Sequence, residues 1–261
     1  MRMADLAARP AKAADAPRRR LLRARPTPWT ALVVVSTVML LAAAAVFGAM
    51  WVWTRTTSST SFTATRPGTL GGVEIEVARG DVEILGSATP DLLVSRVDSS
   101  VFGHSPAERR FVMDGTFRIE SSCPDLVVGS CSADYQLTVP EQAPLTIAAE
   151  HGDVQVTAYR GPAVLSTLGG KLTVDAFCGG ELDATATRGD IEVVATCVPE
   201  RLTLRTTTGD VTLRVPPGRY SIDADTIGGR ADVRGLTDEP DAPAQIQVFS
   251  NDGDIAVDAG S

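Results

Sequence analysis

A short glycine-centred unit recurs along most of the chain and restricts the possible folds more than any other feature. The aligned glycines are Gly80, Gly152, Gly170, Gly189, Gly209, Gly229 and Gly253, separated by intervals of 72, 18, 19, 20, 20 and 24 residues. Positions seven and five before the glycine, and two and four after it, are apolar in every copy. Alternation at period two, interrupted by a glycine turn, predicts two strands in each unit.

One such unit cannot bury its apolar face alone, whereas stacked units share a continuous core. The repeat therefore predicts an all-β fold, a two-sheet β-solenoid whose rungs of roughly 20 residues rise about 4.8 Å each. An antiparallel β-sandwich built from the same strands is the alternative. The long first interval holds a degenerate copy at 109–120, with Asp114-Gly115 as its turn and with Phe117 and Ile119 in the two core positions that follow a turn.

Two of the glycine turns lie in Arg-Gly-Asp tripeptides, at 79–81 and 188–190, the motif that integrins read. The repeat accounts for this motif without adhesion. A turn with positive φ favours glycine, and aspartate tolerates turns because its side chain accepts backbone N–H groups. The residue before the glycine varies from copy to copy, so the tripeptide follows from a repeated Gly-Asp and we expect no integrin recognition.

The residue directly after each glycine forms a second pattern. It is, in order, Asp81, Asp153, Lys171, Asp190, Asp210, Arg230 and Asp254. On a solenoid these side chains make a charge ladder along one edge, and we expect each of the two basic residues, flanked by aspartates, to relieve like-charge repulsion. Calcium needs several oxygens converging on one ion, which a nearby cation opposes. The ladder therefore predicts no metal site, and no cofactor is expected.

All four cysteines follow the apolar N-terminal segment, and an even number in an oxidising compartment predicts disulfides. Cys178 and Cys197 each lie eight residues after an aligned glycine, Gly170 and Gly189. They therefore occupy one column on successive rungs, within the usual Cα–Cα range of a disulfide. Cys123 and Cys131 are then expected to pair with each other and close the loop between them.

Residues 29–53 are a run of 25 without charge, with tryptophan at both ends. As a helix the run spans roughly 37 Å, enough to cross a bilayer, and it is longer than the apolar region of a cleaved signal peptide. Residues 1–28 hold eight basic and two acidic residues, and the remainder holds 16 basic and 30 acidic. The positive-inside rule then places the N-terminus in the cytoplasm and the rest outside the plasma membrane.

The predicted domain organisation has four parts. Residues 1–28 form a disordered basic cytoplasmic arm, 29–53 a single transmembrane helix, 54–66 a Ser/Thr-rich stalk, and 67–258 the extracytoplasmic β-repeat domain. The scarcity of lysine, with an Ala-rich and Arg-rich composition, is typical of a bacterial protein from a GC-rich genome.

The run LTVPEQAPLTIAAEHGDVQV at 137–156, followed by RGDIEV, TGDVTL and DGDIAV, resembles a bacterial "putative adhesin" β-strand-repeat domain of unknown function. The resemblance covers roughly 66–258, and it implies a β-repeat fold and a surface-associated role, with no catalytic residues. The sequence departs from the family pattern where Lys171 and Arg230 follow a Gly-Gly pair in place of Gly-Asp.

These observations favour a non-enzymatic binding, adhesion or scaffold module at the cell envelope. An envelope-stress sensor that works through a partner is an alternative, and a polysaccharide-acting β-helix enzyme is a further one, because such folds host lyases and hydrolases. The carboxylates here sit at repeated turns, and neither His104 nor His151 lies in a nucleophile motif. Expected partners are the membrane and an envelope protein or wall polymer, with self-association possible and no nucleic acid.

Overall fold

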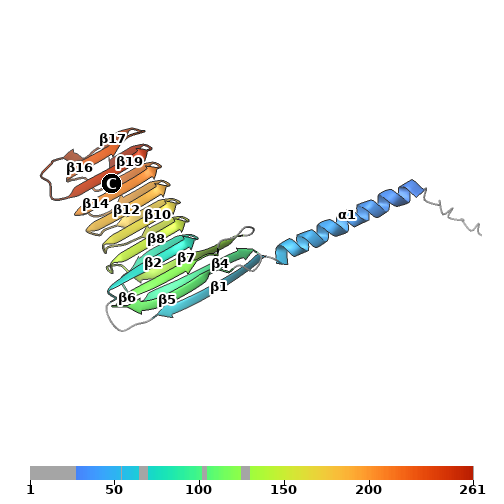
Figure 1. Ribbon diagram of the computed structural model, residues 1–261. Coiled ribbons are helices and arrows are strands. Elements are labelled where there is room, and N and C mark those ends of the chain that lie inside the picture. Colours follow the sequence, from blue (N-terminus) through green and yellow to red (C-terminus); the bar gives the residue numbers. More distant parts are fainter. Residues whose placement is uncertain (1–27, 54, 65–69, 102–104, 125–129, 261) are drawn as a thin grey trace, which may run out of the picture. The chain divides into compact units, whose positions relative to one another are not determined.

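The computed structural model describes residues 28–53, 55–64, 70–101, 105–124 and 130–260. The chain divides into an N-terminal unit and a β domain, and each is described by itself. Helix α1 covers Pro28–Trp53 (Figure 1) and carries no charged residue. Its large apolar side chains are exposed where they are described, for example Leu32 at 67% and Phe47 at 74%.

The transmembrane prediction stays a prediction. Among the residues whose side chains are described, no helix combines the length and the apolar character needed to cross a bilayer. The predicted cytoplasmic arm falls, apart from Pro28, outside the described residues.

The β domain consists of two ten-stranded sheets. In spatial order the first sheet contains β1 (Arg55–Ala64), β4 (Leu92–Val101), β7 (Cys131–Pro140), β3 (Val82–Ser87), β9 (Val154–Thr157), β11 (Leu172–Phe177), β13 (Ile191–Ala195), β15 (Val211–Val215), β20 (Ile255–Ala259) and β17 (Ala231–Arg234). The second contains β18 (Thr237–Asp238), β16 (Arg219–Thr226), β19 (Gln245–Asp252), β14 (Arg201–Thr208), β12 (Glu181–Arg188), β10 (Ala163–Gly169), β8 (Leu145–His151), β2 (Gly72–Arg79), β6 (Thr116–Ser122) and β5 (Ala107–Met113).

Parallel pairing dominates both sheets, as a solenoid requires. Equivalent positions of successive copies lie side by side, so that Leu165 is paired with both Ile147 and Ala184. Antiparallel pairs among the described strands occur at the N-terminal end, where β1 joins β4, β4 joins β7 and β5 joins β6. The solenoid prediction is confirmed for the repeated part, and the antiparallel alternative describes only this end.

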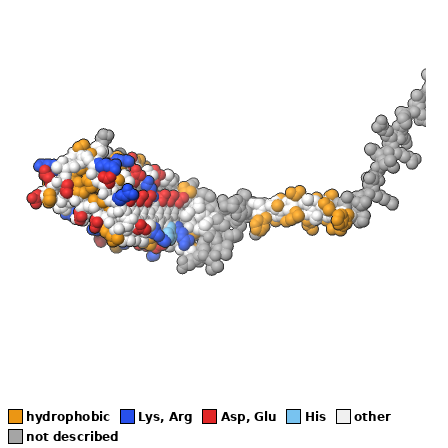
Figure 2. Space-filling view, turned by 90° about the horizontal axis from the view of Figure 1, so that it is seen from above, with side chains coloured by type: hydrophobic (Ala, Val, Ile, Leu, Met, Phe, Trp, Pro, Cys, Tyr) orange, Lys and Arg blue, Asp and Glu red, His pale blue; other side chains and the backbone are white. Residues whose placement is uncertain are grey.

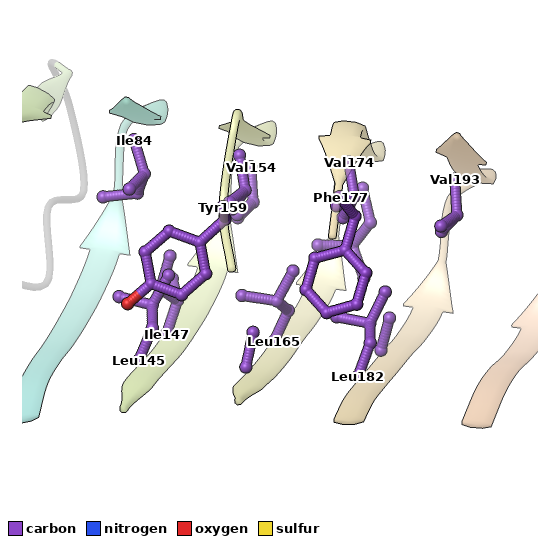
Figure 3. Packing of buried hydrophobic residues seen from close by; sticks show 14 of the residues in the cluster. Ile84, Leu145, Ile147, Val154, Tyr159, Leu165, Val174, Phe177, Leu182 and Val193 are labelled. Carbon is purple, nitrogen blue, oxygen red and sulfur yellow. The ribbon is translucent and has the colours of Figure 1, made fainter. Parts of the chain in front are cut away.

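The core lies between the sheets and is built from the four apolar columns of the repeat (Figure 3). Figure 3 shows Ile84, Val154, Val174 and Val193 from the first sheet facing Leu145, Ile147, Leu165 and Leu182 from the second. Two buried rings, those of Tyr159 and Phe177, fill the space at the second turn of their rungs. The Tyr159 hydroxyl donates a hydrogen bond to the Ala143 carbonyl, and burial raises the pKa of this tyrosine.

The spatial order of the rungs differs from their order in the sequence at both ends. The first rung in sequence, β2–β3, lies between β6–β7 and β8–β9. The last rung, β19–β20, is inserted between β14–β15 and β16–β17, so the Gly229 rung lies at the C-terminal end of the stack. In Figure 1 β19 accordingly lies between β14 and β16.

Two other sequence predictions are corrected here. Residues 55–64 of the predicted stalk form β1, an edge strand paired with β4 along its whole length. Threonine favours strands, and the run RTTSSTSFTA has no apolar alternation to announce one. The copy at 109–120 is an antiparallel hairpin, and Phe117 is paired with Val73, in a column that precedes the turn glycine. Asp114 and Gly115 both have positive φ, 52° and 82°, as a tight hairpin turn requires.

Candidate functional site

The aligned glycines are required by conformation and by space. All but Gly229 have φ between 132° and 157°, where a side chain is strained. The turns also stack so closely that a Cβ on Gly189 would lie 1.9 Å from the Gly170 carbonyl oxygen. Gly229 lies outside that φ range, but a Cβ there would come within 2.0 Å of the Gly253 carbonyl oxygen. These positions therefore set how closely adjacent rungs can approach.

The charge ladder has a specific bonding pattern, because each aspartate accepts a hydrogen bond from the backbone of the next rung. In the first run, Asp134 accepts the Asp81 N–H at 3.1 Å, Asp81 accepts that of Asp153 at 2.9 Å, and Asp153 accepts that of Lys171 at 2.8 Å. Asp134 follows no aligned glycine, so the sequence pattern did not reveal it. Each carboxylate in the run satisfies a backbone donor in a stack of close turns.

A second run repeats the pattern along the rest of the stack. Asp190 accepts the Asp210 N–H at 2.9 Å, Asp210 accepts that of Asp254 at 2.8 Å, and Asp254 accepts that of Arg230 at 2.9 Å. Both runs thus comprise three aspartates and end at a basic residue. The expectation that Arg230 has an aspartate on either side is wrong, because its rung is the outermost and Asp254 is its only neighbour in the ladder.

Lys171 lies where the first run ends and the second begins. Its Nζ donates to Glu192 Oε2 at 2.8 Å. This bond, with the charges of Glu192, Asp190 and Asp153, raises the pKa of Lys171, and the same contact lowers the pKa of Glu192. Figure 2 shows acidic and basic side chains gathered in rows on the visible face of the β domain. Relief of repulsion by Lys171 stays a prediction, with this geometry as its basis.

No three His, Cys, Asp or Glu side chains come together as a possible metal site in the described part of the chain. In the ladder, one oxygen of each of the six aspartates is already bonded to a backbone N–H of the next rung. The carboxylates are therefore distributed one per rung and do not converge.

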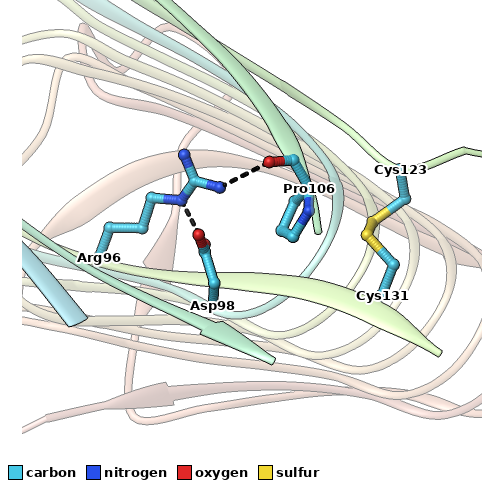
Figure 4. The surroundings of a disulfide bond; sticks show 5 residues. All are labelled: Arg96, Asp98, Pro106, Cys123 and Cys131. Carbon is cyan, nitrogen blue, oxygen red and sulfur yellow. Dashed lines mark hydrogen bonds and ion pairs between the residues drawn. A yellow bond between two sulfur atoms is a disulfide. The ribbon is translucent and has the colours of Figure 1, made fainter. Parts of the chain in front are cut away.

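Both sequence-derived cysteine pairs are bonded. Cys178 and Cys197 join adjacent rungs with their Cα atoms 4.7 Å apart. Cys123 and Cys131, with Cα atoms 5.9 Å apart, close the loop before β7 (Figure 4). The disulfide between Cys123 and Cys131 lies near a buried ion cluster that the sequence pattern did not reveal.

That cluster is centred on Arg96 of β4, whose side chain is only 6% exposed. It donates to Asp98 and, at 3.1 Å, to the Pro106 carbonyl (Figure 4). It also donates to Glu108. Glu108 also accepts from the Tyr135 hydroxyl, and burial raises the pKa of Tyr135 to about 12. A clue existed, since the alternation of Leu92 and Val94 places Arg96 on the inward face. With its partners satisfied, the cluster closes the N-terminal end of the core.

A surface groove of about 470 Å³ crosses the second sheet next to the β5–β6 hairpin. It follows one row of paired positions on neighbouring strands, formed by Glu120, Glu76, Ala148, Ser166 and Thr185. The rest of the lining is Val77, Ala78, Ala107, Glu108, Arg109, Ser121, Ser122, Ala149, Glu150, Thr167, Leu168 and Thr187. No aromatic side chain occurs among these lining residues. The small side chains of Ala148, Ser166 and Thr185 leave the space, and glutamates form part of its lining.

Four residues with a side-chain hydroxyl lie three positions before a turn glycine: Thr167, Thr206, Thr226 and Ser250. Thr167, which also lines the groove, differs from the other three in its hydrogen bonding. Thr206, Thr226 and Ser250 each donate a hydrogen bond to the carbonyl of a turn glycine in the neighbouring rung. Thr167 is 3% exposed, yet its Oγ1 has no hydrogen-bond partner within the described part of the chain. A buried hydroxyl without a partner is costly, and this one lies on the core side of β10, on the same face of the strand as Ala163 and Leu165.

Three solved structures show the relation to known folds. A protein described as a "putative cell adhesion protein" from Clostridium sporogenes aligns with a TM-score of 0.52 and 13% identity, over 78% of this chain and 100% of its own. A "putative adhesin" from Bacteroides fragilis gives 0.42 and 11%, over 78% and 97%. A "putative adhesin" from Parabacteroides distasonis gives 0.33 and 11%, over 77% and 97%. At this identity the first alignment supports the fold alone, and the other two carry no argument.

Comparison with curated protein sequences finds no match. Residues 57–258, by contrast, match the domain family described as Toastrack DUF4097. The match begins inside β1, in agreement with the corrected start of the β domain, and it confirms the resemblance drawn from the glycine repeat. Since it covers most of the sequence, the chain belongs to the Toastrack DUF4097 family.

Proposed function

We propose that this protein is a non-enzymatic binding module, held at the outer face of the plasma membrane by α1, that binds a basic segment of an envelope protein. The observation that carries the binding proposal is the groove across the second sheet. A rigid sheet with a preformed hollow of this size is the usual setting of a binding site. The comparisons give the fold and leave the ligand open.

The charges of the groove favour a cationic ligand. Glu76, Glu120 and Glu150 line it, and Arg109 is its one basic side chain. Arg109 is 82% exposed and lies 3.5 Å from Glu120. The fourth carboxylate, Glu108, is already paired with Arg96 and Arg110. An arriving ammonium or guanidinium group therefore meets an excess of negative charge.

The apolar lining favours a peptide over a glycan. Ala78, Ala107, Ala148 and Leu168 present methyl groups on which the aliphatic stems of lysine and arginine pack well. Glycan sites commonly offer aromatic faces, and this lining has none.

Support for the anchor comes from α1 itself. Its described large side chains are 59% to 81% exposed, with Trp29 the most exposed. Burial of these apolar side chains in a bilayer would stabilise an uncharged helix of 26 residues, which supports the proposed anchor. With the basic N-terminal arm, this favours a cytoplasmic N-terminus and an external β domain.

Binding can be tested with the full chain in lipid vesicles and two labelled peptides, one alternating lysine with serine and one alternating glutamate with serine. Ala148→Arg places a bulky cation within the row of the groove, between Glu76 and Ser166. Thr146→Arg is the matched control, exposed on the same strand two residues earlier and absent from the lining. We expect the lysine peptide to bind the control and to bind Ala148→Arg about tenfold or more weakly.

Equal binding to the two variants, or equal binding of the two peptides, would refute this site. A third outcome is that isolated wall polymer binds to the parent and the Thr146→Arg control while the lysine peptide binds to neither. The ligand would then be wall polymer and not a basic peptide. The anchor has its own test, since protease added to intact, wall-stripped cells should remove the β domain. A protected domain, or one found mainly free in the medium, would contradict the topology.

A further inference from the structure

The two ends of the stack are finished differently. At the N-terminal end, antiparallel strands and the ion cluster around Arg96 close the core. At the C-terminal end β17 is the last strand of the first sheet and is paired on one side only, with β20. Val233 of β17 is 40% exposed, whereas its paired neighbour Val257 is fully buried. The core column that contains Val257 and Val233 thus becomes partly exposed at its last residue, Val233.

The hydrogen-bonding groups of β17 show which part of its edge is free. The Ile255 N–H donates to the Arg230 carbonyl at 2.8 Å, and β17 runs parallel to β20 from there. Since successive residues of a strand direct their backbone groups to opposite sides, Asp232 and Arg234 face β20. Ala231 and Val233 then direct their N–H and C=O groups toward the open edge.

We propose that β17 pairs antiparallel with β17 of a second copy of this chain, centred on Val233, so that two stacks join end to end. Val233 then lies opposite Val233 of the second copy and exchanges both backbone hydrogen bonds with it. In this register Asp232 lies opposite Arg234 of the second copy, and Arg234 opposite its Asp232. A two-fold pairing thus matches opposite charges at both positions and continues the core columns across the junction.

The second sheet limits the contact to this edge. There β18 pairs with Arg219 and Tyr220 of β16, and Asp238 accepts the Ile222 N–H at 3.1 Å. The rest of the β16 edge carries Asp223 and Asp225, which oppose pairing with a second negatively charged copy. The self-complementary charges of β17 favour a second copy over an unrelated strand.

The test uses two charge-reversed variants of the full chain in detergent, Asp232→Arg and Arg234→Asp. Each brings like charges together in its own dimer, so each alone should stay monomeric where the parent associates. Mixed in equal amounts they place two arginines opposite two aspartates, and the dimer should return. Analytical ultracentrifugation from micromolar to near-millimolar protein measures all four samples.

Asp232 and Arg234 side chains are 51% and 70% exposed, so both variants should fold, and a circular dichroism spectrum with a cooperative melt checks this. Asp232 and Arg234 also form an ion pair within β17, which both variants lose. Mixing the variants does not restore this pair, so a dimer that returns on mixing reports contacts between the two copies. A monomeric parent, single variants that associate as the parent does, or a mixture that stays monomeric would each overturn the proposal. Association through α1 would persist in both single variants, which would then associate as the parent does.

Discussion

Gly189, at the centre of the Arg-Gly-Asp tripeptide, gives the sharpest test of how the stack is built. We expect Gly189→Ala to destabilise the β domain strongly, although alanine adds a single methyl group. The residue has φ of 153°, and the new Cβ would lie 1.9 Å from the Gly170 oxygen and 2.7 Å from its carbonyl carbon. Both atoms are backbone, so the neighbouring rung itself has to move.

The size of the effect follows from these two terms. A side chain in this sparsely populated backbone region costs about 1–3 kcal/mol. Overpacking against a rigid neighbour costs about 1–3 kcal/mol more. For a domain of this size each kcal/mol lowers the melting temperature by about 2–4 °C, so the midpoint should fall by roughly 5–20 °C.

The assay is thermal unfolding of the full chain in detergent, followed by circular dichroism, with Gly180→Ala as control. At Gly180 the nearest atom to a new Cβ is the Glu200 side-chain carbon at 3.6 Å, and φ is not in the left-handed region. The control should therefore melt within about 2 °C of the parent. If Gly189→Ala melted with the control, the close stacking of the turns and the structural account of the tripeptide would both be refuted.

Four further predictions concern the cross-link and the ladder. Peptide mapping without reduction should recover Cys178 joined to Cys197. This disulfide should stabilise the folded domain by about 3 kcal/mol. A disulfide from either residue to Cys123 or Cys131 would contradict the register of the rungs. Lys171→Asp should lower the free energy of unfolding by about 0.5–1 kcal/mol at low salt, and by less at high salt, because the contact with Glu192 is partly exposed. An unchanged melting temperature at low salt would refute the stabilising role of Lys171. The contact with Lys171 lowers the pKa of Glu192. The stability that this contact contributes should therefore be present above pH 4.5 and disappear as the pH falls through the lowered pKa. A stability difference between parent and Lys171→Asp that persists in acid would contradict this role of the contact. Millimolar Ca²⁺ should leave the melting midpoint of the parent unchanged, and a large rise would show a metal site.

The repeat was sufficient to predict the pairing of strands within the regular stack. Fixing the columns on one glycine places Leu165 beside Ala184 and Val174 beside Val193, as the structure has them. The same columns brought Cys178 next to Cys197. This worked because a period-two pattern with one turn per unit leaves a single register in which every apolar residue faces inward.

The order of the rungs could not be read in the same way. Gly229 and Gly253 carry the same local pattern, and stacking energy between neighbours does not depend on which copy comes first in the chain. Two indirect signs were present. The interval of 24 between them leaves residues for a longer connection, and the alanines at 224 and 231 supply less apolar surface, as an end rung needs.

The site residues that were missed depend on contacts between distant segments. The Oγ1 of Thr167 has no hydrogen-bond partner among the described residues, a feature that no sequence pattern records. Arg96 stands at an inward position, but its partner Glu108 comes from a hairpin whose placement was predicted in the wrong column. The groove depends on the same hairpin, and so it could not be predicted before the N-terminal strands were placed.

The insertion of β19–β20 has a consequence for incomplete chains. A polypeptide that stops before residue 245 lacks an inner layer of the stack, because its last strands would be the outermost ones. Without β19 and β20, the strands β16 and β17 lose the neighbours with which they pair, and so do the facing edges of β14 and β15. Both sheets of the described stack are therefore continuous only when the segments that form β19 and β20 are present.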